Sequence, residues 1–234
     1  MSRRYYFLLS FLPGLGELGA RPGIEPSAFR AAAWEDDRAG EIADSVLLER
    51  DLLAREGFLA GEIEDPEPLV LSVEQVRGEQ PLPDALAGVE RPGRRVAADA
   101  VWEAYYRHVA RTARRTGCEF LRSCVGFEVA LRNAVAAERA RTLELDPSGY
   151  LVAEDLADED APVGGIVAAW ASAPDPLRGL RALDEARREW AATRSRYFSF
   201  TLDELAAYAR NLVLLDRWRR LAGEERPSGS GRAA

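Results

Sequence analysis

The sequence predicts an all-α protein, a helical bundle built from antiparallel helix pairs, and three observations carry this prediction. Apolar residues recur at steps of three and four along most of the chain after Pro26, which is the helical period. The stretch from Cys118 to Leu143 reads as one long helix whose apolar stripe is wide enough for a place inside a bundle. Part of that helix also recurs later in the chain. We therefore expect well over half of the residues in helices and at most a minor sheet.

The recurring motif is Arg-Asn-x-Val-x-x-acid-Arg, and its two copies start at Arg132 and Arg210, 78 positions apart. The matched residues are Arg132, Asn133, Glu138 and Arg139 in the first copy and Arg210, Asn211, Asp216 and Arg217 in the second. A helical segment precedes each copy, Val96 to Thr116 and Pro176 to Phe198. This arrangement predicts an internal two-fold repeat of helix pairs. Chance similarity between two amphipathic helices is the alternative.

The chain opens with an aromatic-rich apolar run, Tyr5 to Leu12, which Pro13-Gly14 ends. Export is one interpretation, because Arg3-Arg4 precedes the run, but the run is short and no clear cleavage site follows. A second is a dinucleotide fingerprint, since residues 14–19 match G-x-G-x-x-G; the prolines that follow prevent the helix that a pyrophosphate needs. We favour a third, a buried segment that packs on the bundle and ends in a Pro-Gly turn.

Residues 1–92 are predicted to form an N-terminal unit with short helices and an acidic, Pro/Gly-rich connection from Ala60 to Pro92. Helices are expected over Ser27 to Trp34 and Ala39 to Phe58, with Glu49-Arg50-Asp51 on a solvated face of the second. In the connection, Ser72 and Gln75 have the spacing of a capping box. Residues 93–222 would hold the two helix pairs, and 223–234 a disordered tail.

Within the long central helix, a second line of small side chains is expected to let a neighbouring helix come close: Gly126, Ala130, Asn133 and Ala137. Glu128 and Arg132 are spaced to pair along the same helix, and we interpret that pair as exposed. The last helix is expected to begin at a capping box of Thr201 and Glu204.

Composition argues against several classes of function. The formal net charge of −8 disfavours a general binder of nucleic acids or anionic membranes. Cys118 and Cys124 lie on different faces of one helix, so we expect reduced thiols in a cytoplasmic protein. His108 is the only histidine, which leaves neither a zinc site nor a catalytic triad. The carboxylates of residues 154–160 lack the spacing of a calcium loop. We expect no enzyme activity, cofactor, metal or small-molecule substrate.

The densest positive cluster is a set of arginines at the end of the segment Val96 to Thr116: Arg107, Arg111, Arg114 and Arg115. Positive charge is favourable at a helix C-terminus in any case. The cluster is therefore a candidate contact for an acidic protein partner, with RNA binding as a less favoured alternative.

Three motifs resemble an uncharacterised bacterial family encoded in V/A-type ATPase operons: Tyr5 to Leu15, Phe120 to Asn133 and Phe198 to Trp218. In such operons the family stands where the funnel-shaped component of the central stalk would be expected. That component is an all-helical funnel that sits on the membrane rotor ring and receives the foot of the shaft. The resemblance implies a non-catalytic protein of the central stalk that couples shaft to ring. It would be cytoplasmic and peripheral to the inner membrane, with the shaft and the ring as its partners. The alternative is a helical scaffold or regulator without an ATPase link.

Overall fold

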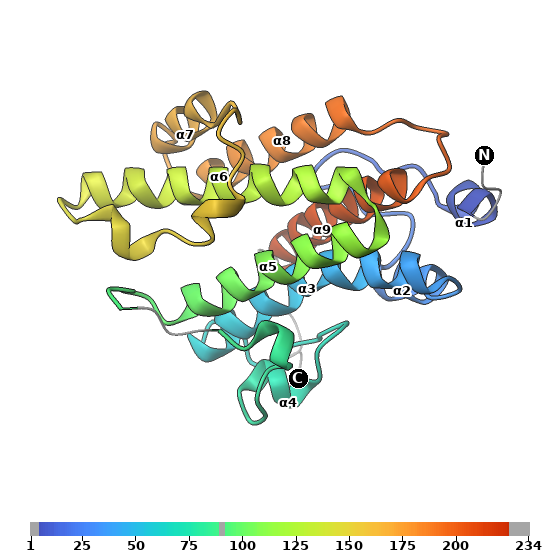
Figure 1. Cartoon of the computed structure of the whole chain (residues 1–234), viewed down its shortest axis with the longest axis horizontal. Coiled ribbons are helices and arrows are strands. Elements are labelled where there is room, and N and C mark those ends of the chain that lie inside the picture. Colours follow the sequence, from blue (N-terminus) through green and yellow to red (C-terminus); the bar gives the residue numbers. More distant parts are fainter. Residues whose placement is uncertain (1–4, 89–91, 225–234) are drawn as a thin grey trace, which may run out of the picture.

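The computed structural model describes residues 5–88 and 92–224, and within these ranges the chain is all-helical, with no strand. The all-α prediction is therefore confirmed (Figure 1). The helices are α1 (Tyr6–Phe11), α2 (Pro26–Ala33), α3 (Asp37–Leu59), α4 (Val73–Arg77), α5 (Ala98–Thr116), α6 (Glu119–Thr142), α7 (Val163–Ala171), α8 (Pro176–Arg194) and α9 (Leu202–Glu224). The predicted tail begins inside α9, and its residues 225–234 lie outside the described part of the chain.

Helix α3 is the centre of the bundle, since it packs against α2, α4, α5 and α9. Its apolar residues are buried, for example Ile42 and Leu47 at 0% exposure. The solvated face predicted for Glu49-Arg50-Asp51 is wrong: Arg50 is 7% and Asp51 0% exposed. Neighbouring helices cover this helix on several sides, so its charged residues lie inside the protein and must find partners there.

Two hairpins make up the second half of the fold, α5 with α6 and α8 with α9 (Figure 1). Gly117 ends α5 at φ +70°, a left-handed conformation that suits glycine and turns the chain directly into α6. The repeated motif lies on the second helix of each hairpin, α6 and α9. The two-fold repeat itself stays a prediction.

The irregular segment of residues 151–158 packs against the line of small residues on α6, where a neighbouring helix was expected. The backbone N–H of Asp158 donates to the carbonyl of Gly126 at 3.0 Å. The Asn133 amide donates to the Val152 carbonyl at 2.8 Å and accepts from the Val152 N–H at 3.0 Å. Residues 151–158 include the 3₁₀ turn η4 (Glu154–Leu156). Small side chains permit this close approach, and the amide replaces the backbone pairing that the segment lacks.

The N-terminal segment was predicted to be buried, which is correct for Tyr5 and wrong for most of α1. Tyr5 is 6% exposed, and Leu8 and Leu9 pack partly against the core. Phe7 is 80% and Phe11 77% exposed. A helix of six residues rests on the bundle along one side only, so its opposite side faces outward.

Candidate functional site

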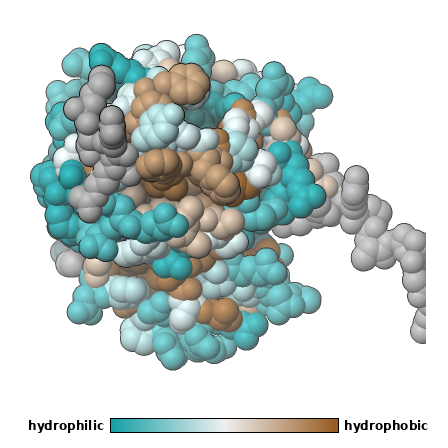
Figure 2. Space-filling view, turned by 90° about the vertical axis from the view of Figure 1, so that its right-hand side faces the viewer, coloured by the Kyte–Doolittle hydropathy of each residue, from teal (hydrophilic) through white to brown (hydrophobic). Residues whose placement is uncertain are grey.

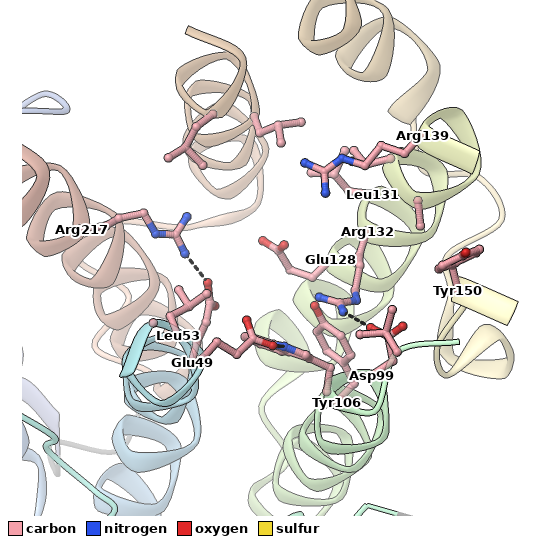
Figure 3. Close-up of a pocket in the computed structure, with 18 of the residues that line it drawn as sticks. Glu49, Leu53, Asp99, Tyr106, Glu128, Leu131, Arg132, Arg139, Tyr150 and Arg217 are labelled. Carbon is pink, nitrogen blue, oxygen red and sulfur yellow. Dashed lines mark hydrogen bonds and ion pairs between the residues drawn. The ribbon is translucent and has the colours of Figure 1, made fainter. Parts of the chain in front are cut away.

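A cleft of about 890 Å³ opens between α3, α5, α6, α8 and α9, at the end of the bundle where α6 finishes (Figure 3). One part of its wall is apolar and includes Leu53, Leu131, Val135, Leu143, Leu145, Leu180, Leu183 and Leu221. The inner part carries charged side chains, and the carboxylate of Glu128 points into the space between the helices (Figure 3).

Six charged side chains close a ring of ion pairs here, and four of them line the cleft: Glu49, Glu128, Arg187 and Arg217. The six are three carboxylates and three guanidinium groups: Glu49, Glu128, Asp184, Arg187, Arg210 and Arg217. Each arginine bridges two of the acids. Arg210 joins Glu49 to Glu128. Arg187 joins Glu128 to Asp184, at 3.0 and 2.9 Å. Arg217 joins Asp184 to Glu49, at 3.0 and 2.8 Å. The formal charges of the six groups therefore cancel.

The ring is well shielded from water, since none of its six side chains is more than 15% exposed. It links α3, α6, α8 and α9, and the indole N–H of Trp218 adds a hydrogen bond to Asp184 at 3.0 Å. Buried charges are costly unless paired, and removing one partner of a buried pair costs about 3–5 kcal/mol. The ring therefore ties four helices together, because moving any one of them away would leave a buried charge without its partner.

The ring also perturbs the acid–base behaviour of its members. Burial alone would raise the pKa of Glu128, but Arg187 and Arg210 outweigh that effect and lower it to about 2. Burial lowers and the neighbouring carboxylates raise the pKa of Arg187 and Arg210, with a net rise for both. These groups keep their charges throughout the neutral pH range.

A second buried cluster lies next to the ring on α3. The Arg50 guanidinium contacts Asp216 of α9 at 2.9 Å. Asp51 accepts hydrogen bonds from the backbone N–H groups of three consecutive residues, 69–71, at 2.7 to 3.1 Å. Burial raises the pKa of Asp51, and these hydrogen bonds oppose the rise. The cluster fixes the chain that leads into α4, where the predicted capping box of Ser72 and Gln75 is confirmed.

The two motif copies make different contacts. The first copy lies near the surface: Arg132 pairs with Asp99 at 2.6 Å, and Glu138 pairs with Arg141 at 2.6 Å. Arg139 lies over the ring of Trp170. The predicted pairing of Glu128 with Arg132 is wrong, because Glu128 turns instead to the arginines of α8 and α9.

The second copy supplies buried members of the two clusters, Arg210 and Arg217 in the ring and Asp216 beside Arg50. Asn211 donates only to the Ala207 carbonyl of its own helix, at 3.0 Å, and its amide oxygen has no partner among the described atoms. The residues matched by sequence are thus not matched in their contacts.

The predicted arginine cluster is divided between paired and exposed side chains. Arg107 forms ion pairs with Glu103 at 3.0 Å and Asp155 at 2.8 Å, and Arg115 pairs with Glu41 at 3.0 Å. Arg111, Arg114 and Arg115 are all exposed, but Arg115 is engaged in the ion pair with Glu41. The positive charge available to a partner on this helix is therefore mainly that of Arg111 and Arg114.

The opposite end of the molecule carries an aromatic surface. Its exposed members come from α1, the end of α2 and the loop after α8, and we name them together the aromatic end: Tyr6, Phe7, Phe11, Trp34, Tyr197 and Phe198. Figure 2 shows apolar side chains gathered in the middle of this face, with hydrophilic residues around them. Tyr6 packs on Phe200, with ring centroids 4.7 Å apart, so α1 and the loop form one surface.

The loop of the aromatic end has an unusual backbone. Phe198 and Phe200 both have positive φ, 60° and 53°, a conformation that costs about 1–3 kcal/mol for a non-glycine residue. The Glu204 carboxylate offsets this cost by accepting hydrogen bonds from both backbone N–H groups, at 2.8 and 2.7 Å. The predicted capping box is half formed: Thr201 accepts from the Glu204 N–H at 3.4 Å. Phe198 thereby projects outward, 82% exposed.

Comparison of the chain with protein-family models, with curated proteins and with solved structures gives no match. Among the residues that the structure describes, no helix combines the length and the apolar character that a membrane crossing requires.

Proposed function

We propose that the protein is a non-catalytic coupling component of a bacterial V/A-type ATPase, and that its cleft receives the end of a helix from a partner protein of that complex. One observation carries the proposal: four charged residues of the cleft wall, Glu49, Glu128, Arg187 and Arg217, are held in a closed ring of ion pairs that Asp184 and Arg210 complete. Asp99 and Arg132 of the wall also pair with each other, and the leucines of the wall are available for apolar contacts. The class of partner comes from the resemblance of the three motifs in Tyr5 to Leu15, Phe120 to Asn133 and Phe198 to Trp218.

The acid–base properties of the ring favour binding over chemistry. A general acid or base works best when its pKa lies near the working pH. The pKa of Glu128 is about 2, and those of Arg187 and Arg210 are raised above the ordinary arginine value. Such groups exchange no protons near neutral pH. They are suited to holding four helices around a cleft of constant shape.

The size of the cleft suits the end of a helix. An α-helix with its side chains is about 10–12 Å across and rises about 5.4 Å per turn. A volume of about 890 Å³ therefore accommodates roughly one to two turns. An apolar terminus entering the cleft would contact the leucines of the wall, with the neutral ring beneath it. In a rotary ATPase this occupant would be the foot of the shaft, which would keep the protein on the cytoplasmic side of the inner membrane.

The experiment is a pull-down of tagged protein from the native host, with substitutions at the rim of the cleft. Leu143 and Leu145 line the cleft and are 66% and 46% exposed, so Leu143→Glu with Leu145→Glu should leave the fold intact. Leu59→Glu with Leu177→Glu is the matched control, because these leucines are 58% and 41% exposed and lie outside the cleft.

We expect the wild type and the control to recover ATPase subunits and the rim variant to lose them, at an unchanged unfolding midpoint. The purified protein alone should not hydrolyse ATP. If the wild type recovers other proteins and no ATPase subunit, the coupling role is wrong and the scaffold alternative takes its place. If the rim variant recovers ATPase subunits as well as the control does, the cleft is not the contact.

A further inference from the structure

We propose that the aromatic end binds the surface of a lipid bilayer that contains anionic headgroups. Binding there would be peripheral: the side chains of α1 and of the loop at residues 195–201 would enter the zone between headgroups and acyl chains. This surface lies at the other end of the bundle from the cleft (Figure 1). Lipid binding would hold whether or not an ATPase subunit occupies the cleft.

The first argument is the kind of apolar residue that this end exposes. All of the exposed aromatic residues of the described chain lie in the aromatic end, with Phe7, Phe11 and Phe198 at 77–82% exposure. The exposed large aliphatic residues lie elsewhere: Leu59, Val73, Val96, Leu143, Leu145 and Leu177. Rings with one apolar and one polar edge, as in tyrosine and tryptophan, are favoured at the boundary between bilayer and water. The segregation of aromatic residues at one end fits that boundary.

The second argument is that the loop is built to project its rings. Two phenylalanines hold positive φ, and the Glu204 carboxylate fixes the backbone N–H groups of both. The ring of Phe198 is 82% exposed, so the positive-φ backbone does not serve to bury this ring in the core. Glu204 is therefore a positioning residue that presents Phe198 for insertion.

The third argument is charge. Exposed Arg196 directly precedes Tyr197-Phe198, and exposed Arg194 lies two residues before Arg196. Arginines beside membrane-inserting aromatic residues attract anionic headgroups. The chain as a whole carries −8, which opposes the approach of its other faces to an anionic bilayer. Exposed Glu35 lies in the turn between α2 and α3, and exposed Asp37 is the first residue of α3, so contact should be made mainly by α1 and the loop.

The test is co-sedimentation of the full chain with vesicles of phosphatidylcholine and phosphatidylglycerol. We expect the wild type to sediment with them at low salt, and Phe7→Ser with Phe198→Ser to reduce the bound fraction about tenfold or more. Leu59→Ser with Leu177→Ser is the matched control and should bind as the wild type does. Thermal unfolding of every variant checks that the fold is retained.

Two further measurements separate insertion from attraction by charge. Phe198→Trp should place a fluorophore in the bilayer, with a blue-shifted emission that brominated lipids quench. Arg194→Ala with Arg196→Ala should weaken binding to anionic vesicles, and added salt should weaken binding of the wild type. Glu204→Ala should loosen the loop and reduce the quenching.

The proposal is overturned if the wild type fails to bind anionic vesicles at low salt, or if the leucine control loses binding as much as the phenylalanine variant. It is also overturned if the wild type is an oligomer that the phenylalanine variant converts to monomers while neither binds vesicles. The occupant of the aromatic end would then be a second copy of the chain. If the surface binds purified ATPase subunits and no vesicles, its occupant is a protein.

Discussion

The guanidinium Nε of Arg187 lies 3.0 Å from the carboxylate of Glu128, although the two residues are 59 positions apart on different helices. Arg210 of α9 occupies the other side of the same carboxylate. Ion pairs of Glu128 thus join α6 to α8 and α9, and the stability and the pH dependence that these pairs confer can be measured.

Loss of one ring arginine should destabilise the protein strongly. We expect Arg210→Met to lower the free energy of unfolding by about 3–5 kcal/mol, because Glu49 and Glu128 would be left buried beside an uncharged side chain. Arg122→Met is the matched control, since Arg122 pairs with Glu119 at the surface, with 63% and 65% exposure, and such pairs contribute about 0–1 kcal/mol. Urea unfolding measures both. Equal losses in the two variants would contradict a buried ring.

Stability should fall in acid because of Glu128. Its pKa is lowered from 4.5 to about 2 in the folded protein, so its contribution is fully present above about pH 4.5 and is lost as the pH falls towards 2. By linkage this loss amounts to about 3 kcal/mol. The pH dependence of the urea midpoint measures it. Glu128→Gln should be less stable at neutral pH and should flatten the curve between pH 4.5 and 2; a curve as steep as that of the wild type would assign the acid sensitivity to other groups.

The two asparagines of the repeated motif should differ in their importance. Asn133→Ala removes two hydrogen bonds to the Val152 backbone and should cost about 1–3 kcal/mol, since a partly buried segment then loses its pairing. Asn211→Ala removes one bond within its own helix and should cost less than about 1 kcal/mol. Each variant is compared with the wild type by thermal unfolding. Similar losses would indicate that the two positions are equivalent, as the repeat predicted.

The two cysteines should be unreactive in the folded protein. Burial raises the pKa of Cys124 to about 12 and that of Cys118 further, while only the thiolate reacts readily. At pH 8 we expect alkylation by iodoacetamide to be slow and to accelerate in urea with the unfolding transition. Rapid modification of the native protein would show that the first turns of α6 open more easily than their burial suggests.

The exposed part of the arginine cluster should contribute to partner binding through charge. Arg111→Glu with Arg114→Glu is expected to weaken association with the ATPase subunits, and more strongly at low salt, because screening is then smallest. Arg178→Glu with Arg181→Glu reverses two exposed arginines of α8 and serves as the control. Pull-downs over a range of salt concentrations compare the two. Identical recovery from both variants would remove the cluster from the interface.

The sequence by itself determined the features that depend on near neighbours. The helical period predicted α3, α5, α6, α8 and α9 to within a few residues, except that α8 ends at Arg194 where the loop to α9 begins. The Ser72 and Gln75 capping box needs only residues three positions apart, and it forms as predicted. The glycine-rich residues 14–19 also start no helix, since the next helix begins at Pro26.

The ring and the aromatic end were decided by tertiary structure. Three consecutive charged residues, Glu49-Arg50-Asp51, look like a solvated helix face because the sequence does not show which element packs against them. In the structure, α9 brings Asp216 and Arg217 to that face from more than 160 positions away. The signal present in the sequence was the spacing of Arg210 and Arg217, two helical turns apart, opposite an Asp184 and Arg187 pair.

The exposure of Phe7 could not be predicted from the sequence either. An apolar residue favours burial, but the sequence does not show whether another element packs over it. Local periodicity therefore determined the helices. The long-range packing decided which charges became buried partners and which aromatic rings stayed outside.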